Sequence, residues 1–141
     1  ANSDSYYIVE IKSLKRILDA VDKTGRPVLC FIDEVLRGTN TVERIAASSE
    51  ILKNLNTGRA LCFAATHDIE LTTILKDCYS NYHFQEEVTE DEVKFDYKLY
   101  AGPATTRNAI KLLNVIGYDK NIIKGAEQRA MHFLTDGNWK S

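Results

Sequence analysis

The first part of the chain alternates between helical and strand-like patterns of apolar residues. Residues 5–22 carry apolar side chains three or four positions apart, which predicts an amphipathic helix that ends before Gly25. The next apolar run begins at Val28 and closes with two carboxylates, Asp33 and Glu34. Such a run predicts a strand that is buried on both faces, as in a parallel sheet. The helical residues expected to point inward are Ile11, Leu14, Leu18 and Val21.

The order of helix, glycine and strand then occurs a second time. Thr41 is the expected N-cap of a helix that ends at Gly58, and residues 60–66 repeat the apolar strand pattern. Because the two strands are separated by a helix, βαβ winding is favoured and the predicted fold class is α/β. The inward residues of this helix are predicted to be Ile45, Ala46, Ser49, Leu52 and Leu55.

The pattern changes in the second half. After a short helix predicted over residues 68–76, residues 81–88 and 93–100 alternate between polar and apolar positions, as in an antiparallel hairpin that Gly102 and Pro103 end. The hairpin residues expected to be buried are Tyr82, Phe84 and Val88, or Val93, Phe95, Tyr97 and Leu99.

Two further helices are predicted near the C-terminal end. They cover residues 106–116 and 120–134, with Gly117 as a left-handed stop and Asp119 as the N-cap of the second helix. Their apolar faces are Ile110, Leu113 and Ile116, then Ile123, Ala126, Ala130 and Phe133 or Leu134. These faces either pack within their own domain or form a contact with a second subunit.

Composition narrows the class of protein. The chain has 141 residues, 44% apolar and 27% charged, which suits a soluble globular domain with its own core. A net charge of −2 argues against a nucleic-acid-binding face in this segment. No apolar run approaches the ~18–20 residues of a membrane span, so no membrane contact is expected. Three cysteines, an odd number, suit reduced thiols in a cytoplasmic protein better than a disulfide framework.

Two neighbouring predicted strands end in side chains that suit nucleotide hydrolysis. Asp33 and Glu34 close the first strand and His67 follows the second. Because parallel strands present their carboxyl ends at one edge of a sheet, these side chains are expected to meet there. The alternative is that the carboxylates are solvent-exposed and His67 is structural. A metal site of His67, Asp68 and Glu70 is disfavoured, because these residues are almost consecutive and no second pair of ligands is apparent.

Three blocks of sequence carry a resemblance to a known family. They are SYYIVEIKSLKRIL from Ser5, VLCFIDEVLRGTNTVERIA from Val28 and CFAATHDIELT from Cys62. In order and spacing they resemble the ATPase domain of the DNA mismatch-repair MutS family, which belongs to the ABC-type ATPases. Tyr6-Tyr7 and Val42-Glu43-Arg44 depart from the family pattern and indicate a divergent MutS-like branch.

The resemblance implies a P-loop NTPase-type sheet with ATP and Mg²⁺ as cofactors. Asp33 resembles the Walker B aspartate that holds Mg²⁺, a hard cation that prefers oxygen ligands. Glu34 resembles the catalytic glutamate that orients the attacking water, and His67 resembles the switch histidine that contacts the γ-phosphate. Residues 104–141 resemble the C-terminal helix-turn-helix of the family, which leaves residues 1–103 as the ATPase portion.

Two further segments resemble parts of the family that act across a dimer. Ser5 matches the signature serine that reaches a nucleotide held by the partner subunit, and its alternative role is to cap its own helix. The D-loop that couples the two sites is matched by residues 37–41, with Gly38, Thr39, Asn40 and Thr41 as its expected nucleotide-binding residues, and the alternative is an ordinary polar loop. The implied partner is a second copy of the protein, and DNA is expected to bind outside this chain.

One expected motif does not occur in the sequence. No Gly-x-x-x-x-Gly-Lys-Ser/Thr phosphate loop is present, and the resemblance places that loop before Ala1. The chain is therefore expected to be part of an ATPase and to be inactive by itself. The alternatives are a non-enzymatic dimerisation or regulatory module and another ABC-type ATPase of chromosome maintenance. Without the upstream region, residues 60–65 are expected to form an open apolar edge that self-associates or is covered by the hairpin.

Overall fold

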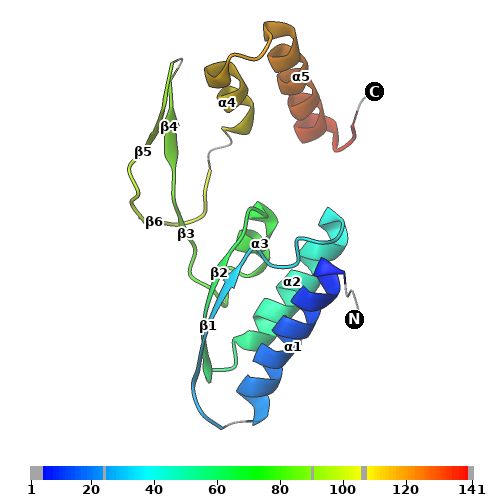
Figure 1. Cartoon of the computed structure of the whole chain (residues 1–141), viewed down its shortest axis with the longest axis vertical. Coiled ribbons are helices and arrows are strands. Elements are labelled where there is room, and N and C mark those ends of the chain that lie inside the picture. Colours follow the sequence, from blue (N-terminus) through cyan, green and yellow to red (C-terminus); the bar gives the residue numbers. More distant parts are fainter. Residues whose placement is uncertain (1–4, 24, 90, 106–107, 140–141) are drawn as a thin grey trace. The chain divides into compact units, whose positions relative to one another are not determined.

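The computed structural model describes residues 5–23, 25–89, 91–105 and 108–139 (Figure 1). Contacts divide the chain into two compact units, Ala1–Asn81 and Tyr82–Ser141. The expected boundary after residue 103 rests on the family resemblance and stays a prediction, whereas the hairpin falls in the same compact unit as the C-terminal helices. Asn108, which is buried, gives a physical reason: its side-chain amide donates to the carboxylate of Glu86 at 3.1 Å and so ties the hairpin to the start of the next helix.

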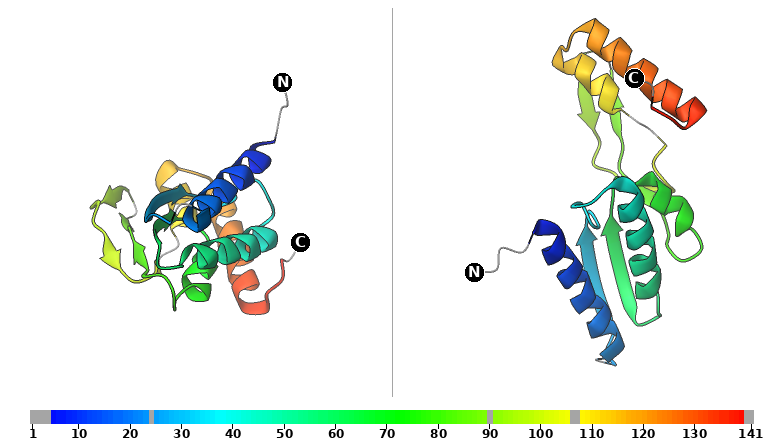
Figure 2. Two further views of the ribbon diagram at one scale, coloured as in Figure 1. Left: turned by 90° about the horizontal axis from the view of Figure 1, so that it is seen from below. Right: turned by 90° about the vertical axis from the view of Figure 1, so that its right-hand side faces the viewer.

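The first unit is a βαβ unit with additional helices. Its elements are α1 (Tyr6–Lys23), β1 (Val28–Asp33), α2 (Thr41–Leu55), β2 (Ala60–Ala65) and α3 (Ile69–Ile74). β1 and β2 pair in parallel, with Val28 opposite Ala60 and Asp33 opposite Ala65. α1 and α2 lie on the same side of this strand pair (Figures 1 and 2). The predicted βαβ winding and α/β class are confirmed.

The core of the first unit lies between the strand pair and these helices. The stripe predicted for α1 is largely correct, because Leu14 and Val21 are buried, whereas Ile11 remains exposed. The buried apolar side chains are Leu14, Val21, Cys30, Val35, Leu36, Leu52, Leu55, Leu71 and Leu75. Each fully buried leucine contributes about 1.5–3 kcal/mol to folding, so this cluster holds α1, α2 and α3 onto one face of the sheet.

The prediction that the strands are buried on both faces is wrong for this chain. Cys30 points into the core, but Phe31 is 72% exposed and Leu61 is 61% exposed. Phe31 and Phe63 stack on the opposite face with ring centroids 5.3 Å apart. The strand residues are apolar on both faces of the β1–β2 pair. Helices of the first unit cover the face that carries Cys30, whereas the face that carries Phe31 and Leu61 is exposed. We call Leu29, Phe31, Leu61 and Phe63 the open sheet face.

The start of α2 also differs from the prediction. The N-cap is Asn40, not Thr41, because the Asn40 side chain accepts a hydrogen bond from the Glu43 backbone N–H at 3.0 Å. Along the helix, Ser48 is fully buried, whereas the predicted Ala46 is exposed. Ser48 fits this position because its small side chain donates to the Val35 carbonyl at 3.5 Å, which satisfies the hydroxyl.

The second unit begins with the predicted antiparallel hairpin. β4 (Glu86–Val88) pairs with β5 (Val93–Phe95), and β3 (Tyr82–His83) pairs with β6 (Tyr100–Ala101). The pairing is interrupted at Tyr97, whose φ of 55° takes the backbone out of the strand conformation. The predicted burial is wrong for most of the hairpin: Val88 and Val93 are half-buried, but the aromatic residues and one leucine are exposed, namely Tyr82, Phe84, Phe95, Tyr97 and Leu99.

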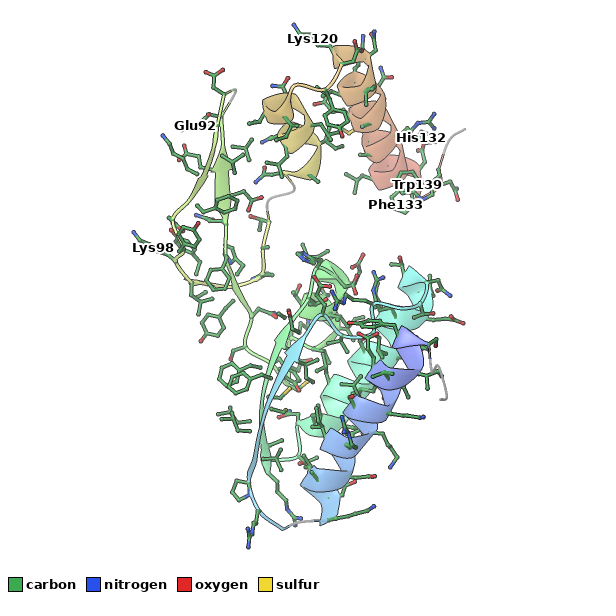
Figure 3. All side chains as sticks on the ribbon, viewed as in Figure 1. Glu92, Lys98, Lys120, His132, Phe133 and Trp139 are labelled. Carbon is green, nitrogen blue, oxygen red and sulfur yellow. The ribbon has the colours of Figure 1, made fainter. Side chains whose placement is uncertain are left out.

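The two C-terminal helices are close to the predicted ranges, although residues 106 and 107, where the first was predicted to begin, lie outside the described residues. They are α4 (Ala109–Ile116) and α5 (Lys120–Asp136), separated by Gly117, whose φ of 92° ends α4 in the left-handed conformation. Asp119 caps α5 by accepting from the Asn121 N–H at 2.8 Å. At the other end of α5, Phe133 and Trp139 stack with centroids 4.3 Å apart (Figure 3). Neither helix has a buried residue among those described.

The strands described in the structure form three separate two-stranded sheets. Among these strands β2 pairs only with β1. The expectation that the apolar edge of residues 60–65 self-associates or is covered by the hairpin stays a prediction. The three cysteines are free thiols, as expected, and Cys30 is buried. Within the described residues, no helix is both long and apolar enough to cross a membrane.

Candidate functional site

The candidate site lies at the carboxyl end of the β1–β2 pair. Asp33 is the last residue of β1, and its partner Ala65 is the last residue of β2. The Glu34 N–H donates to the Ala65 carbonyl at 2.9 Å, which continues the pairing by one residue. Because the register brings both strand ends to the same level, the chain after β2 delivers His67 beside Glu34, with Nε2 3.3 Å from Oε1.

The Glu34 carboxylate lies between two basic side chains. Its Oε1 is 3.3 Å from Nε2 of His67, and its Oε2 is 3.0 Å from Nη1 of Arg37. The Glu34 side chain is about one-third exposed, whereas that of His67 is 92% exposed. The site therefore opens to solvent on the histidine side, where a ligand can reach both side chains.

The backbone bends sharply at this point. Glu34 has a φ of 51° and Leu36 a φ of 58°, both in the left-handed region that residues other than glycine rarely adopt. Val35 and Leu36 are buried, so the turn inserts two apolar side chains into the core while it turns the carboxylate of Glu34 out. Unusual backbone of this kind is common at functional sites.

The start of α1 adjoins this loop. Nη2 of Arg37 donates to the hydroxyl of Tyr6 at 2.5 Å, and the guanidinium lies 5.5 Å from the centre of the Tyr6 ring. The Tyr6 hydroxyl and, less strongly, the Glu34 carboxylate raise the pKa of Arg37, so its positive charge is kept beside Glu34. Gly38 lies against Tyr7: a Cβ on Gly38 would be 2.7 Å from the Tyr7 Cβ.

The remaining predicted residues occupy the ends of helices. Ser5 is exposed and caps α1, since its Oγ accepts from the Ile8 N–H at 3.5 Å. Thr39 and Asn40 both donate side-chain hydrogen bonds to the carboxylate of Glu43, at 3.2 and 2.5 Å. Thr41 is the first residue of α2. Hydrogen bonds to Glu43 in the first turn of α2 thus hold the loop of Gly38, Thr39, Asn40 and Thr41.

Sequence reasoning missed two residues that the structure brings to the site, Tyr6 and Arg44, which lie within the departures from the family pattern. Arg37 was expected only as part of the D-loop, and its contacts with Glu34 and Tyr6 were not predicted. Arg44 binds Asp68 through two hydrogen bonds, from Nε to Oδ2 at 2.7 Å and from Nη2 to Oδ1 at 2.5 Å. Opposite charges 24 positions apart carry no local signal, so only packing reveals this pair.

The donor set at the strand ends can be compared with the needs of Mg²⁺ and ATP. Asp33 provides an exposed carboxylate, which suits a hard cation that keeps most of its ligands as water and phosphate oxygens. Among residues 5–23, 25–89, 91–105 and 108–139, no group of three or more His, Cys, Asp or Glu side chains could hold a metal ion alone. A single carboxylate of this kind is compatible with a cation that takes its other ligands from water and phosphate, and the described residues offer no all-protein metal site.

The βαβ unit with acidic residues and a histidine at its strand ends defines an α/β domain, and comparison with known proteins identifies its family. A model of MutS domain V matches residues 1–134. The chain belongs to the MutS family through this domain.

The relatives found by sequence are DNA mismatch repair proteins. The chain is 33% identical over 131 residues to DNA mismatch repair protein MutS of Natronomonas pharaonis, covering 91% of this chain and 15% of that protein. It is 28% identical to DNA mismatch repair protein MutS 2 of Haloarcula marismortui, over 96% of this chain and 14% of that protein. With DNA mismatch repair protein MutS of Aquifex pyrophilus the identity is 30%, over 88% of this chain and 14% of that protein. The chain thus spans a small part of the length of these relatives.

Proposed function

We propose that this chain supplies the carboxylate and histidine side of an ATP-hydrolysing site in a DNA-repair protein of the MutS family. The observation that carries the proposal is the Glu34 carboxylate beside His67, at the carboxyl end of two parallel strands. Family membership favours this function over another ABC-type ATPase of chromosome maintenance.

Each side chain has a chemical role in this proposal. Glu34 accepts a hydrogen bond from the attacking water and orients it, an effect typically worth about 10²–10⁴ in rate. His67 is exposed and donates toward the terminal phosphate, and Asp33 holds the waters around Mg²⁺. Bound Mg²⁺ would supply positive charge against the phosphate oxygens. The phosphate-binding loop itself comes from a segment other than this chain, which has none.

Arg37 gives Glu34 a second partner that competes with this role. With Nη1 at 3.0 Å from Oε2, Arg37 forms an ion pair with the Glu34 carboxylate that limits the rotation of that side chain. Both side chains are partly exposed, so the pair contributes at most about 1 kcal/mol and can open when a nucleotide arrives.

The central test uses two carboxylate substitutions in the full-length protein. Glu34→Gln should keep ATP binding but abolish turnover, because the shape is retained and the charge that orients the water is lost. Asp33→Asn should instead weaken binding of ATP in the presence of Mg²⁺. Nucleotide titrations and steady-state phosphate release measure the two effects. Wild-type turnover in Glu34→Gln would refute the assignment.

The same site is proposed to be completed by a second subunit. Ser5 stands at the N-terminus of an 18-residue helix, where its hydroxyl and the helix dipole both favour an anion held by a partner. The exposed apolar residues of α4 and α5 support a further contact between subunits: they include Ile116, Ile122, Met131 and Leu134. A purely structural dimerisation module would share this surface but would not need Glu34 or His67.

The effect of ATP on assembly tests the role of Ser5. We expect the full-length protein to dimerise more strongly with ATP, and Ser5→Arg to remove that effect because a bulky cation displaces the hydroxyl from the partner site. Light scattering with and without ATP provides the measurement, and Ser5→Thr is the control that keeps a hydroxyl. Equal dimerisation of wild type and Ser5→Arg would count against a role in trans.

A further inference from the structure

The pair formed by Arg44 and Asp68 joins α2 to the segment that follows β2. Both oxygens of the Asp68 carboxylate are engaged, at 2.7 and 2.5 Å, in the two-pronged geometry that only arginine can provide. The side chains are 23% and 11% exposed, so solvent screens this pair far less than a surface ion pair.

Asp68 directly follows His67, and its backbone is held as well. The Asp68 N–H donates to Oγ1 of Thr66 at 3.0 Å. Asp68 occupies the N-cap position of α3, but its carboxylate makes no hydrogen bond to that helix. Its side chain is therefore committed to Arg44, and the contacts of Thr66 and Asp68 fix the chain on both sides of His67.

Packing does little to position the His67 imidazole. It is 92% exposed, so packing does not select one rotamer, and Nε2 lies 3.3 Å from the Glu34 carboxylate. A shift of its backbone by one ångström would break this contact, and misplacement of that size can cost about 10²-fold in rate.

The neighbouring residue holds the other loop of the site. Glu43 accepts from the side chains of Thr39 and Asn40, while Arg44 reaches Asp68. The first turn of α2 thus binds the loop before it and the loop after β2. Both residues belong to the segment in which this sequence departs from the family pattern.

We propose that Arg44 is a positioning residue, which holds Asp68 and thereby keeps the His67 imidazole in reach of Glu34 and of the phosphate. The effect of Arg44 on catalysis rests on the function proposed above. The geometric part, that Arg44 fixes the position of His67, is independent of that function. Arg44 itself touches neither nucleotide nor water in this role.

The geometric part is tested by nuclear magnetic resonance on the 141-residue chain. The chain has three histidines, so ¹³C labelling of the imidazole rings yields a small set of signals, and His67→Gln assigns the relevant one. Arg44→Lys keeps the charge but cannot engage both oxygens of Asp68. We expect it to shift or broaden the signal of His67 and to leave those of His83 and His132 unchanged. Arg16→Lys is the matched control, because Arg16 bonds only to Ser13 within α1 among the contacts described.

The catalytic part is tested by ATP turnover of the full-length protein. Arg44→Lys and Asp68→Asn should each lower kcat about tenfold while nucleotide affinity and the thermal midpoint stay near those of the wild type. The double variant should lose little more than either single variant, because both act through one contact. Arg16→Lys should leave kcat unchanged.

The two experiments distinguish failure of the positioning role of Arg44 from failure of the proposed function. An unchanged His67 signal in Arg44→Lys overturns the proposal, and so does a fall in kcat that is matched by weaker nucleotide binding and a lower thermal midpoint. If the wild-type protein does not hydrolyse ATP, the proposed function fails, and the His67 signal alone decides whether Arg44 positions the histidine.

Discussion

Glu34 and Leu36 adopt a backbone conformation that costs each of them free energy. A left-handed conformation for such residues costs about 1–3 kcal/mol. The side chain of Leu36 is 1% exposed, and burial of a leucine contributes about 1.5–3 kcal/mol, so Leu36 offsets its own strain. Glu34 has no such compensation, since its contacts with Arg37 and His67 are partly exposed. The strain at Glu34 is therefore best explained by the orientation of its carboxylate.

Another residue whose chemistry depends on burial is Cys30. Burial and, secondarily, the neighbouring Cys62 thiol raise the pKa of Cys30 to about 12 from 9.0. The folded state disfavours the Cys30 thiolate. Ionisation of Cys30 therefore leaves the free energy of unfolding unchanged below pH 9 and lowers it as the pH rises from 9 toward 12.

Alkylation should reveal this difference at a single residue. At pH 8 iodoacetamide should leave Cys30 unmodified in the native chain, because the thiolate is the reacting form and the side chain is buried. In concentrated guanidinium all three cysteines should react. Peptide mass spectrometry measures both states, and equal rates at Cys30 in the native and unfolded chain would contradict the prediction.

At the scale of elements, α1 is held against the loop before α2 by a contact that admits no extra atom. A Cβ on Gly38 would lie 2.7 Å from the Tyr7 Cβ and 3.2 Å from the Tyr7 Cα. The Cα belongs to the helix backbone and cannot rotate away. The absence of a side chain at Gly38 thus lets the start of α1 approach the candidate site closely.

Gly38→Ala should therefore destabilise the first unit by about 1–3 kcal/mol, the usual cost of overpacking. The matched control is Gly125→Ala in the middle of α5, where nothing lies within 4 Å and φ is ordinary, so that stability should rise by about 0.5–1 kcal/mol. Amide hydrogen exchange in each unit separates the two effects. Similar changes for both variants would argue against the close contact.

The caps and periodicities of most elements were predictable, because they depend on neighbours within one or two turns. Gly117 as the left-handed stop and Asp119 as the cap of α5 are confirmed. Thr41 was the wrong cap because two adjacent residues could both serve, and hydrogen bonds between Asn40 and Glu43 decide between them. The burial of the hairpin was also wrong, because alternation predicts two different faces without showing what covers either.

At the scale of the whole molecule, the open sheet face is an exposed apolar surface of the first unit. Leu29, Phe31, Leu61 and Phe63 lie on the side of the β1–β2 pair opposite Cys30, and β2 has no other strand partner among the described residues. Exposed apolar faces and open strand edges both promote association.

The 141-residue chain by itself should therefore self-associate, and Phe31→Ser combined with Phe63→Ser should weaken the association. It should also show no ATPase activity, because no phosphate loop holds a nucleotide before Glu34. Sedimentation velocity and a phosphate-release assay measure the two expectations. Tyr97→Ser, at an exposed hairpin position, is a control for the loss of an aromatic side chain. A wild-type chain that stays monomeric would disprove the predicted self-association. Robust Mg²⁺-dependent hydrolysis of ATP would disprove the predicted lack of activity.

The sequence by itself determined the βαβ order, the ends of the main helices, and the placement of Asp33, Glu34 and His67 at adjoining strand ends. These features follow from local periodicity, capping and the geometry of parallel strands. Only the tertiary structure decided that Glu34 lies between Arg37 and His67, that Arg44 binds Asp68, and which sheet face is open. Such contacts join residues whose distance along the chain says nothing of their distance in space, because packing of the helices on the sheet brings them together.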